Sequence, residues 1–251
     1  MRSALLEKQL ADVLGGHIGW QVRPAPETVR IGVPELDAVT GGIPRGCLTE
    51  IFGPASSGRA SLLASILAEA THREEVCVLV DAEDCFDPLS AAMAGVRLER
   101  LLWIRCGHNA EYALKAVDLL IQGGGFGLVI LDLGGTPPQT ARRISLTSWF
   151  RLRRAVENTP TVLVSVARQS NAKTCASLML ECAREGASWP GGVPLLRSMR
   201  MRIRIWRRKP GRVVTASYEA FAQEPFAGPQ DSGATASSTL EAAQPNLVTG
   251  E

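Results

Sequence analysis

The stretch LTEIFGPASSGRASLL, residues 48–63, decides how this chain folds. Its first five residues suit a short buried strand, its glycine-bounded centre a loop, and its last residues the start of a helix. This is the layout of a phosphate-binding P-loop, in which backbone N–H groups and the helix N-terminus form an anion site. Gly53 and Gly58 stand at the spacing of the pattern G-x-x-x-x-G-K-[ST]. The stretch therefore predicts the phosphate-binding corner of an α/β domain.

Two positions depart from that pattern. Arg59 stands where lysine would reach the phosphates, and its charge is spread over a planar fork instead of a point. Ala60 stands where a Ser or Thr hydroxyl would hold Mg²⁺. Ser61 follows about 100° further around the helix, so it is not expected to replace that hydroxyl. We therefore expect very slow ATP hydrolysis or none.

Glycine-bounded turns also occur where a helix merely packs closely on a sheet, so the strands that follow are informative. The apolar run 76–80 ends in the sequence Asp81-Ala82-Glu83, and the apolar run 128–131 ends in Asp132. Parallel strands place their carboxyl ends at one edge of the sheet, where such folds bind ligands. These acids are therefore expected near the P-loop.

Bulk properties are those of a globular protein. The 251 residues, 45% of them hydrophobic, suit one α/β domain with appendages. We expect neither a signal peptide nor a membrane-spanning helix, because no long apolar run occurs. The six cysteines include no C-x-x-C pair, which favours reduced thiols in a cytoplasmic protein over a metal site or a disulfide framework.

Charge is distributed unevenly. Five of the 25 acidic residues follow the last basic residue, Arg212, so residues 1–218 carry a net charge of +7. Five arginines and no acid lie between Asp132 and Glu157, and eight basic residues and no acid lie between Glu185 and Glu219. The positive charge of the core is therefore concentrated in these two runs.

Three regions follow from composition and periodicity. Residues 1–30 hold an amphipathic helix over 3–14 and a linker, and the helix docks either on its own domain or on a second copy in a homo-oligomer. Residues 31–218 form the nucleotide-binding core, and residues 219–251 form a disordered acidic tail. Beyond the P-loop, we expect helices at 61–73, 87–95, 109–122 and 142–157 and strands at 76–80, 101–106, 128–132 and 161–166. Antiparallel strands are expected near 174–182, 198–207 and 211–218.

Four segments in order resemble the RecA family of recombinases and their relatives. They read GVPELDAVTGGIPRG (32–46), EIFGPASSGR (50–59), CVLVDAEDCFDP (77–88) and AGVRLERLLWIRC (94–106). The resemblance implies an α/β fold: a RecA-like P-loop core with a mostly parallel twisted sheet, flanking helices and an antiparallel C-terminal extension of the sheet. It also implies ATP and Mg²⁺ as cofactors.

The resemblance assigns roles to individual residues. Glu83 matches the catalytic carboxylate that positions water, and Asp132 the metal-binding acid. The family's phosphate-sensing glutamine falls near the sequence Ala167-Arg168-Gln169. Ser90 replaces the tyrosine that stacks on adenine, which implies weaker binding of the base. The full cofactor-binding set is Gly53, Pro54, Ala55, Ser56, Ser57, Gly58, Arg59, Ala60, Ser61, Asp87 and Asp132. Glu83 and Asp132 could instead cap helices or pair with Arg59, and that alternative stays open.

DNA binding has a candidate in the second basic run. Only 28 residues separate Asp132 from Thr161, which is too few for the mobile DNA-binding loop of recombinases, and their C-terminal domain is replaced by the acidic tail. Residues 200–205 alternate arginine with apolar residues, so the arginines share one face of a strand. The proposed single-stranded DNA contacts are Arg200, Arg202, Arg204, Trp206, Arg207 and Arg208. A solvated edge strand whose charges prevent aggregation is the alternative.

Together these features are most similar to ImuA, a RecA-like group in bacterial translesion-synthesis assemblies. We expect a DNA-repair accessory protein of the DNA damage (SOS) response, whose degenerate P-loop can bind ATP but hydrolyses it poorly. Its partners would be the proteins of a translesion or recombination assembly and single-stranded DNA, with no membrane. One alternative is an active DNA-dependent ATPase or recombinase. The other is a regulatory nucleotide-binding module that does not bind DNA.

Overall fold

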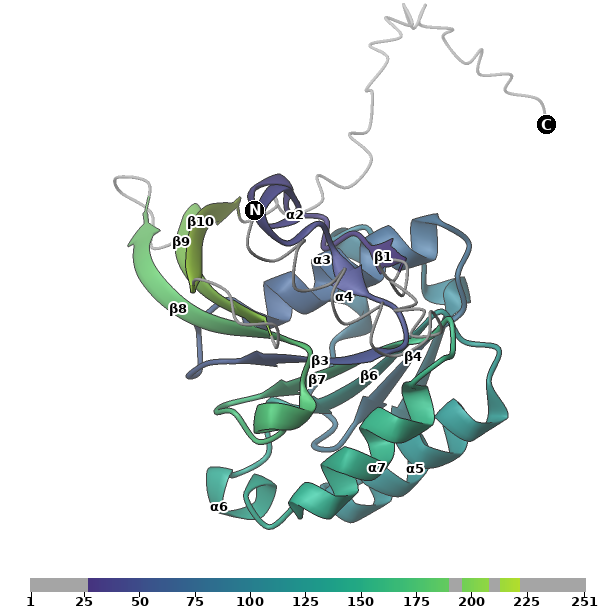
Figure 1. Ribbon diagram of the computed structural model, residues 1–251. Coiled ribbons are helices and arrows are strands. Elements are labelled where there is room, and N and C mark those ends of the chain that lie inside the picture. Colours follow the sequence, from purple (N-terminus) through teal and green to yellow (C-terminus); the bar gives the residue numbers. More distant parts are fainter. Residues whose placement is uncertain (1–26, 190–195, 208–212, 222–251) are drawn as a thin grey trace, which may run out of the picture.

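One twisted eight-stranded sheet organises the protein (Figure 1). The computed structural model describes residues 27–189, 196–207 and 213–221. The strands are β3 (Cys47–Phe52), β4 (Cys77–Asp81), β5 (Leu101–Arg105), β6 (Leu128–Leu133), β7 (Val162–Ala167), β8 (Leu178–Ser188), β9 (Ser198–Arg207) and β10 (Val214–Phe221). Their order is β10-β9-β8-β3-β7-β6-β4-β5, and a separate short pair joins β1 (Thr28–Val29) to β2 (Ile43–Pro44). The expected α/β fold with a mostly parallel sheet is confirmed.

Helices cover both faces of this sheet. They are α2 (Pro34–Thr40), α3 (Arg59–His72), α4 (Pro88–Met93), α5 (Ala110–Gly123), α6 (Pro138–Ala141) and α7 (Leu146–Val156), with 3₁₀ turns η1 (Leu98–Arg100) and η2 (Lys173–Cys175). Figure 1 shows α2, α3 and α4 on one side of the sheet and α5 and α7 on the other. The central strands β4, β6 and β7 are therefore buried on both faces, which is why they read as continuous aliphatic runs and not as alternating ones.

The C-terminal strands differ from the expectation in one respect. β8 pairs parallel to β3, and antiparallel pairing begins only between β8 and β9. β8 also starts later than predicted, because residues 173–175 form the turn η2. Strands β8, β9 and β10 curve toward the side of α2 and α3 in Figure 1, and apolar residues of all three join the core around α3.

Other boundaries also shift. The helix predicted over 142–157 corresponds to α7, which begins only at Leu146, where the hydroxyl of Ser145 accepts a hydrogen bond from the N–H of Ser148. The short helix α6 precedes the predicted range and was not expected. The expected linker contains strand β1, and β10 extends three residues past the predicted boundary at residue 218. The predicted helix over 3–14 and the tail beyond Phe221 lie outside the described residues. Within the described ranges, none of the helices has the length and apolar character needed to span a membrane.

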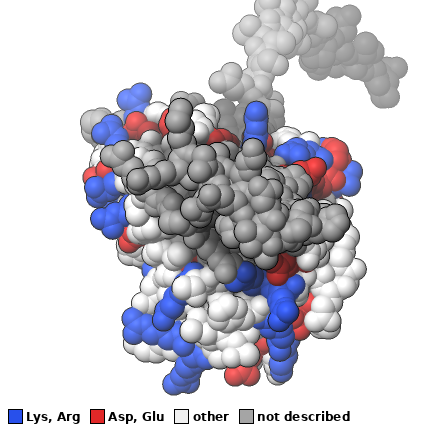
Figure 2. Space-filling view, in the orientation of Figure 1, with Lys and Arg blue, Asp and Glu red and all other residues white. Residues whose placement is uncertain are grey.

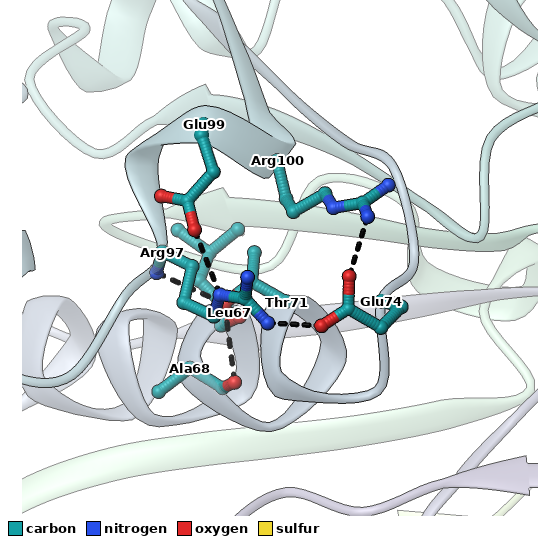
Figure 3. Close-up of polar contacts among 7 residues, drawn as sticks. All are labelled: Leu67, Ala68, Thr71, Glu74, Arg97, Glu99 and Arg100. Atoms are coloured by element: carbon teal, nitrogen blue, oxygen red, sulfur yellow. Dashed lines mark hydrogen bonds and ion pairs between the residues drawn. The ribbon is translucent and has the colours of Figure 1, made fainter.

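A charged network fastens the end of α3 to the η1 turn (Figure 3). Glu74 accepts hydrogen bonds from Arg97 and Arg100, and Arg97 also binds Glu99 at 2.8 Å. The hydrogen bond from Arg97 lowers the pKa of Glu74. Beneath these exposed groups, the buried hydroxyl of Thr71 accepts the backbone N–H of Arg97 at 3.2 Å. Because the ion pairs face solvent, the buried hydrogen bond is the firmer link.

A buried carboxylate anchors the segment after β7. Glu50 of β3 has no exposed surface, and its Oε1 accepts the backbone N–H groups of Asn171 at 2.6 Å and Ala172 at 2.8 Å. Its Oε2 accepts the hydroxyl of Ser170 at 2.7 Å. Charge-assisted bonds of this kind are stronger than neutral ones. Glu50 therefore fixes the loop that leads from β7 into β8.

Replacing this carboxylate should destabilise the protein. In Glu50→Ala, two buried N–H groups lose their acceptor, so we expect the free energy of unfolding to fall by about 3 kcal/mol or more in urea titrations. Glu111→Ala, at an exposed position in the first turn of α5, is the control and should cost about 0.5 kcal/mol or less. Equal losses in the two variants would contradict the anchoring role.

Candidate functional site

The carboxyl edge of the sheet brings the predicted nucleotide residues together. The P-loop follows β3, Glu83 follows β4, and Asp132 lies near the end of β6. In the strand register, Asp132 pairs with Asp81 on one side and with Val166 on the other. The acids after β4 and in β6 thus share the edge from which the P-loop emerges.

The P-loop makes a tight turn between β3 and α3. Gly58 has a φ of 87° and Ser56 a φ of 56°, and α3 begins directly after the loop at Arg59. Pro54, Ala55, Ser56, Ala60 and Ser61 are exposed, so the loop is open to solvent. The hydroxyl of Ser57 is buried and has no hydrogen-bond partner among the described residues.

Both signature glycines also have a packing role. A Cβ on Gly58 would lie 1.9 Å from Sδ of Met201 in β9, and one on Gly53 would lie 2.2 Å from the carbonyl oxygen of Cys182 in β8. A larger residue at Gly53 would collide with the backbone of β8, and one at Gly58 would have to displace the side chain of Met201. The glycine spacing therefore serves the fold as well as the loop.

The side chain of Arg59 turns toward the end of β6. Its Nη2 lies 3.5 Å from the carbonyl oxygen of Gly134, and its buried Nη1 has no hydrogen-bond partner in the described part of the chain. Burial lowers the pKa of Arg59, although the charge of Asp132 acts in the opposite direction. Nη1 of Arg59 is thus a hydrogen-bond donor beside the P-loop that the described residues leave without an acceptor.

Asp132 is a half-buried carboxylate with a backbone partner. Its Oδ1 accepts the N–H of Gly134 at 2.7 Å. Burial raises the pKa of Asp132 to about 6, against the effects of that hydrogen bond and of Arg59. The residues fit Mg²⁺ poorly, because Ala60 offers no hydroxyl and the Arg59 cation is close by. Over the described ranges, no group of three His, Cys, Asp or Glu side chains could hold a metal ion.

The other predicted residues have local partners. Oε2 of Glu83 lies 3.1 Å from Nδ1 of His108, a residue with a φ of 62° that the sequence did not single out. Asp87 caps α4 by accepting the N–H groups of Leu89 and Ser90. Asp87, a predicted nucleotide contact, therefore has a capping role at α4, and Glu83 lies beside a histidine.

Arg168 is the cation that sequence reasoning did not place in the site. Its Nε donates to the carbonyl oxygen of Gly134 at 3.1 Å, and its Nη2 donates to that of Gly135 at 3.3 Å. The neighbouring Gln169 instead accepts Nη2 of Arg142 at 2.7 Å. Arg168, and not the neighbouring Gln169, is therefore the residue that shares the carbonyl oxygen of Gly134 with Arg59.

The arginine strand has the predicted alternation. Met201, Ile203 and Ile205 are buried, whereas Arg200, Arg202 and Arg204 are exposed on the other face. Arg202 lies 3.4 Å from Glu185, and Arg204 lies 3.3 Å from Glu181, both on β8. These cross-strand pairs reduce the charge available for phosphate. The side chain of Arg207 and all of Arg208 lie outside the described part.

Trp206 lies in a groove that the sequence did not predict. The half-buried indole stacks on Phe52, with ring centroids 6.0 Å apart and planes 15° apart. The groove has a volume of about 600 Å³. We call it the Trp206 groove, and its lining is Phe150, Arg153, Ser170, Lys173, Thr174, Ala176, Met179 and Trp206.

This groove combines exposed aromatic surface with cations. Phe150 on α7 is 48% exposed, and Arg153 and Lys173 supply positive charge. Figure 2 shows Lys and Arg atoms on both sides of an uncharged surface in the lower half of the molecule, the part that holds α5, α6 and α7 in Figure 1. Arg153 belongs to the acid-free arginine run before Glu157, but no sequence pattern indicated the aromatic side chains that line the groove with it.

Comparison with known proteins places this geometry in a family. Residues 8–138, just over half of the chain, match the model of the RecA N-terminal domain. Protein RecA of Ectopseudomonas oleovorans is 43% identical over 94 residues, which are 37% of this chain and 26% of that protein. Protein RecA of Chloroflexus aurantiacus is 31% identical over 160 residues, 57% of this chain and 45% of that protein. Protein RecA of Colwellia psychrerythraea is 38% identical over 108 residues, 42% of this chain and 31% of that protein.

In each of these alignments the chain spans less than half the length of the relative. The family match covers the P-loop, the acids after β4 and in β6, and the first strands of the core in chain order, and it ends at the start of α6. The chain therefore belongs to the family defined by the RecA N-terminal domain.

Proposed function

We propose that this RecA-family protein is a DNA-repair accessory factor of the ImuA type, which binds ATP at its P-loop, hydrolyses it poorly and binds single-stranded DNA. It would act in a translesion or recombination assembly of the DNA damage response. The observation that carries the proposal is the altered P-loop at the carboxyl edge of a RecA-family sheet. Ala60 removes the hydroxyl ligand, while the loop backbone stays exposed to solvent before the N-terminus of α3, where a phosphate could bind.

Retained binding and reduced hydrolysis are compatible at this edge of the sheet. The P-loop backbone and two arginines can contact phosphates without any chemical step. Hydrolysis additionally requires a positioned water and a stabilised leaving oxygen. Glu83 is the candidate for positioning water, but it is engaged by His108 at 3.1 Å. The loss of the hydroxyl ligand acts in the same direction.

ATP turnover should respond to restoration of the P-loop. The unaltered protein should release phosphate very slowly, with or without single-stranded DNA. Arg59→Lys combined with Ala60→Thr should raise the Mg²⁺-dependent rate, because the point charge and the hydroxyl ligand return. Adding Asp132→Asn to that double variant is the control and should remove the gain. Robust Mg²⁺-dependent turnover by the unaltered protein would favour the alternative of an active DNA-dependent ATPase.

The Trp206 groove supports the DNA part of the proposal. Aromatic faces stack on bases of any sequence, and nearby cations contact the sugar-phosphate backbone. Here Phe150 and Trp206 line the same groove as Arg153 and Lys173. No ion pair of Arg153 or Lys173 with an acid occurs within the described ranges, whereas Arg202 and Arg204 are paired with glutamates. The groove is therefore a better candidate than the arginine stripe on β9.

Stacking in the groove can be tested at one residue. Trp206→Ala should weaken binding of a labelled oligothymidine on the order of tenfold, because a base–aromatic stack contributes about 1–3 kcal/mol. Fluorescence anisotropy measures the affinity. Trp189→Ala is the matched control, since this tryptophan is 59% exposed at the end of β8 and outside the groove, and its loss should leave the affinity unchanged. Similar losses in both variants would contradict a specific stacking site.

Salt dependence distinguishes the groove from the arginine stripe. Replacing both Arg153 and Lys173 by glutamine should reduce the slope of log affinity against log salt by about 0.7 for each phosphate that the variant no longer neutralises. Replacing both Arg202 and Arg204 by glutamine removes the same formal charge but should change the slope less. The opposite ranking would favour DNA binding on β9. No binding of single-stranded DNA at low salt would favour the regulatory module that does not bind DNA.

A further inference from the structure

We propose that the guanidinium groups of Arg59 and Arg168 take the place of Mg²⁺ at the P-loop, so that the protein binds the metal-free form of a nucleoside triphosphate. This inference rests on the proposed nucleotide binding and specifies the chemical form of the ligand. The contacts of the two arginines with Gly134 carry it.

The first step concerns the convergence of two cations. Arg59 starts α3, and Arg168 follows β7, yet both lie beside the carbonyl oxygen of Gly134, with Nη2 of Arg59 at 3.5 Å and Nε of Arg168 at 3.1 Å. Neither forms an ion pair within 4.0 Å among the described residues. Like charges held at one carbonyl oxygen repel each other, and the nearby carboxylate of Asp132 offsets this positive charge only in part. The pair is therefore suited to an anion between the P-loop and the end of β6.

The second step concerns unused hydrogen-bond donors. Nη1 of Arg59 is buried, and the described chain supplies no acceptor for it. A Cβ built on Gly134 would lie 3.1 Å from this Nη1, so the donor is next to the end of β6. The hydroxyl of Ser57, inside the P-loop, is also buried without a partner among the described residues. Phosphate oxygens are acceptors that would satisfy both groups.

The third step is the poor fit of Mg²⁺. This ion requires near-ideal octahedral oxygen coordination, commonly including the P-loop hydroxyl and phosphate oxygens. Ala60 cannot contribute, and Oδ1 of Asp132 already accepts the N–H of Gly134. Two guanidinium groups carry the same charge as one Mg²⁺, and an added divalent cation would be repelled by both. Arg59 and Arg168 thus repel the metal ion and also supply the positive charge that the ion would bring.

Calorimetric titration with a non-hydrolysable β,γ-imido analogue of ATP tests the inference. The full-length protein should bind the analogue in EDTA at least as tightly as in excess Mg²⁺. Arg168→Gln keeps an amide donor but removes the charge, and it should weaken binding in EDTA on the order of tenfold. Arg59→Lys with Ala60→Thr should reverse the preference, so that Mg²⁺ strengthens binding.

Arg154→Gln is the matched control. It removes the same charge from an exposed position in the last turn of α7, which leads into β7 and therefore lies at the opposite edge of the sheet. Its affinity for the analogue should equal that of the unaltered protein.

The outcomes separate this inference from the proposed function. Binding that requires Mg²⁺, or binding that Arg168→Gln and Arg154→Gln weaken equally, would overturn the replacement of the metal and leave nucleotide binding in place. An absence of binding both in EDTA and in Mg²⁺ would instead overturn the proposed nucleotide binding, and the inference with it.

Discussion

The structure depends on the pairing of β3 along both of its edges. β3 is hydrogen-bonded in parallel to β7 on one side and to β8 on the other, so its end cannot shift without disturbing the whole sheet. The P-loop leaves directly from that end, and Arg59 follows it at a fixed position. The segment after β7 is held by Glu50 of the same strand. One strand therefore positions both the P-loop and a wall of the Trp206 groove.

The local pattern of apolar and polar residues predicted most of the fold, because it indicates which segments are buried. Aliphatic runs such as 128–131 can only be buried strands, and Gly53 with Gly58 fixed the turn between β3 and α3. The order of the strands in the sheet was harder to predict, since β8 pairs with β3 although more than 100 residues of sequence separate them. The apolar alternation of β9 showed which side of it is buried, but it could not show that glutamates of β8 lie beside its arginines.

The sequence predicted the residues of the candidate site only where a known motif assigns a role to each position. The P-loop, Glu83 and Asp132 follow from spacing and resemblance, and the structure places them along one edge. Arg168 and His108 lie in loops, and their contacts depend on the direction in which each side chain points. Sequence spacing predicts that direction in helices and strands but not in loops. The Trp206 groove likewise joins residues from α7, η2, β8 and β9. A site that is lined by residues from several elements cannot be recognised from the sequence, because those residues lie far apart along the chain.

The close contacts of Gly53 and Gly58 with β8 and β9 bear on how such a chain could diverge. Alanine at either position would collide with the carbonyl oxygen of Cys182 or the side chain of Met201, whether or not a nucleotide ever binds. Selection for a folded sheet is therefore sufficient to retain both glycines during evolution. Position 60 faces no comparable restriction from packing, since Ala60 is exposed. A lineage that no longer needed catalysis would lose the hydroxyl at this position first and keep both glycines.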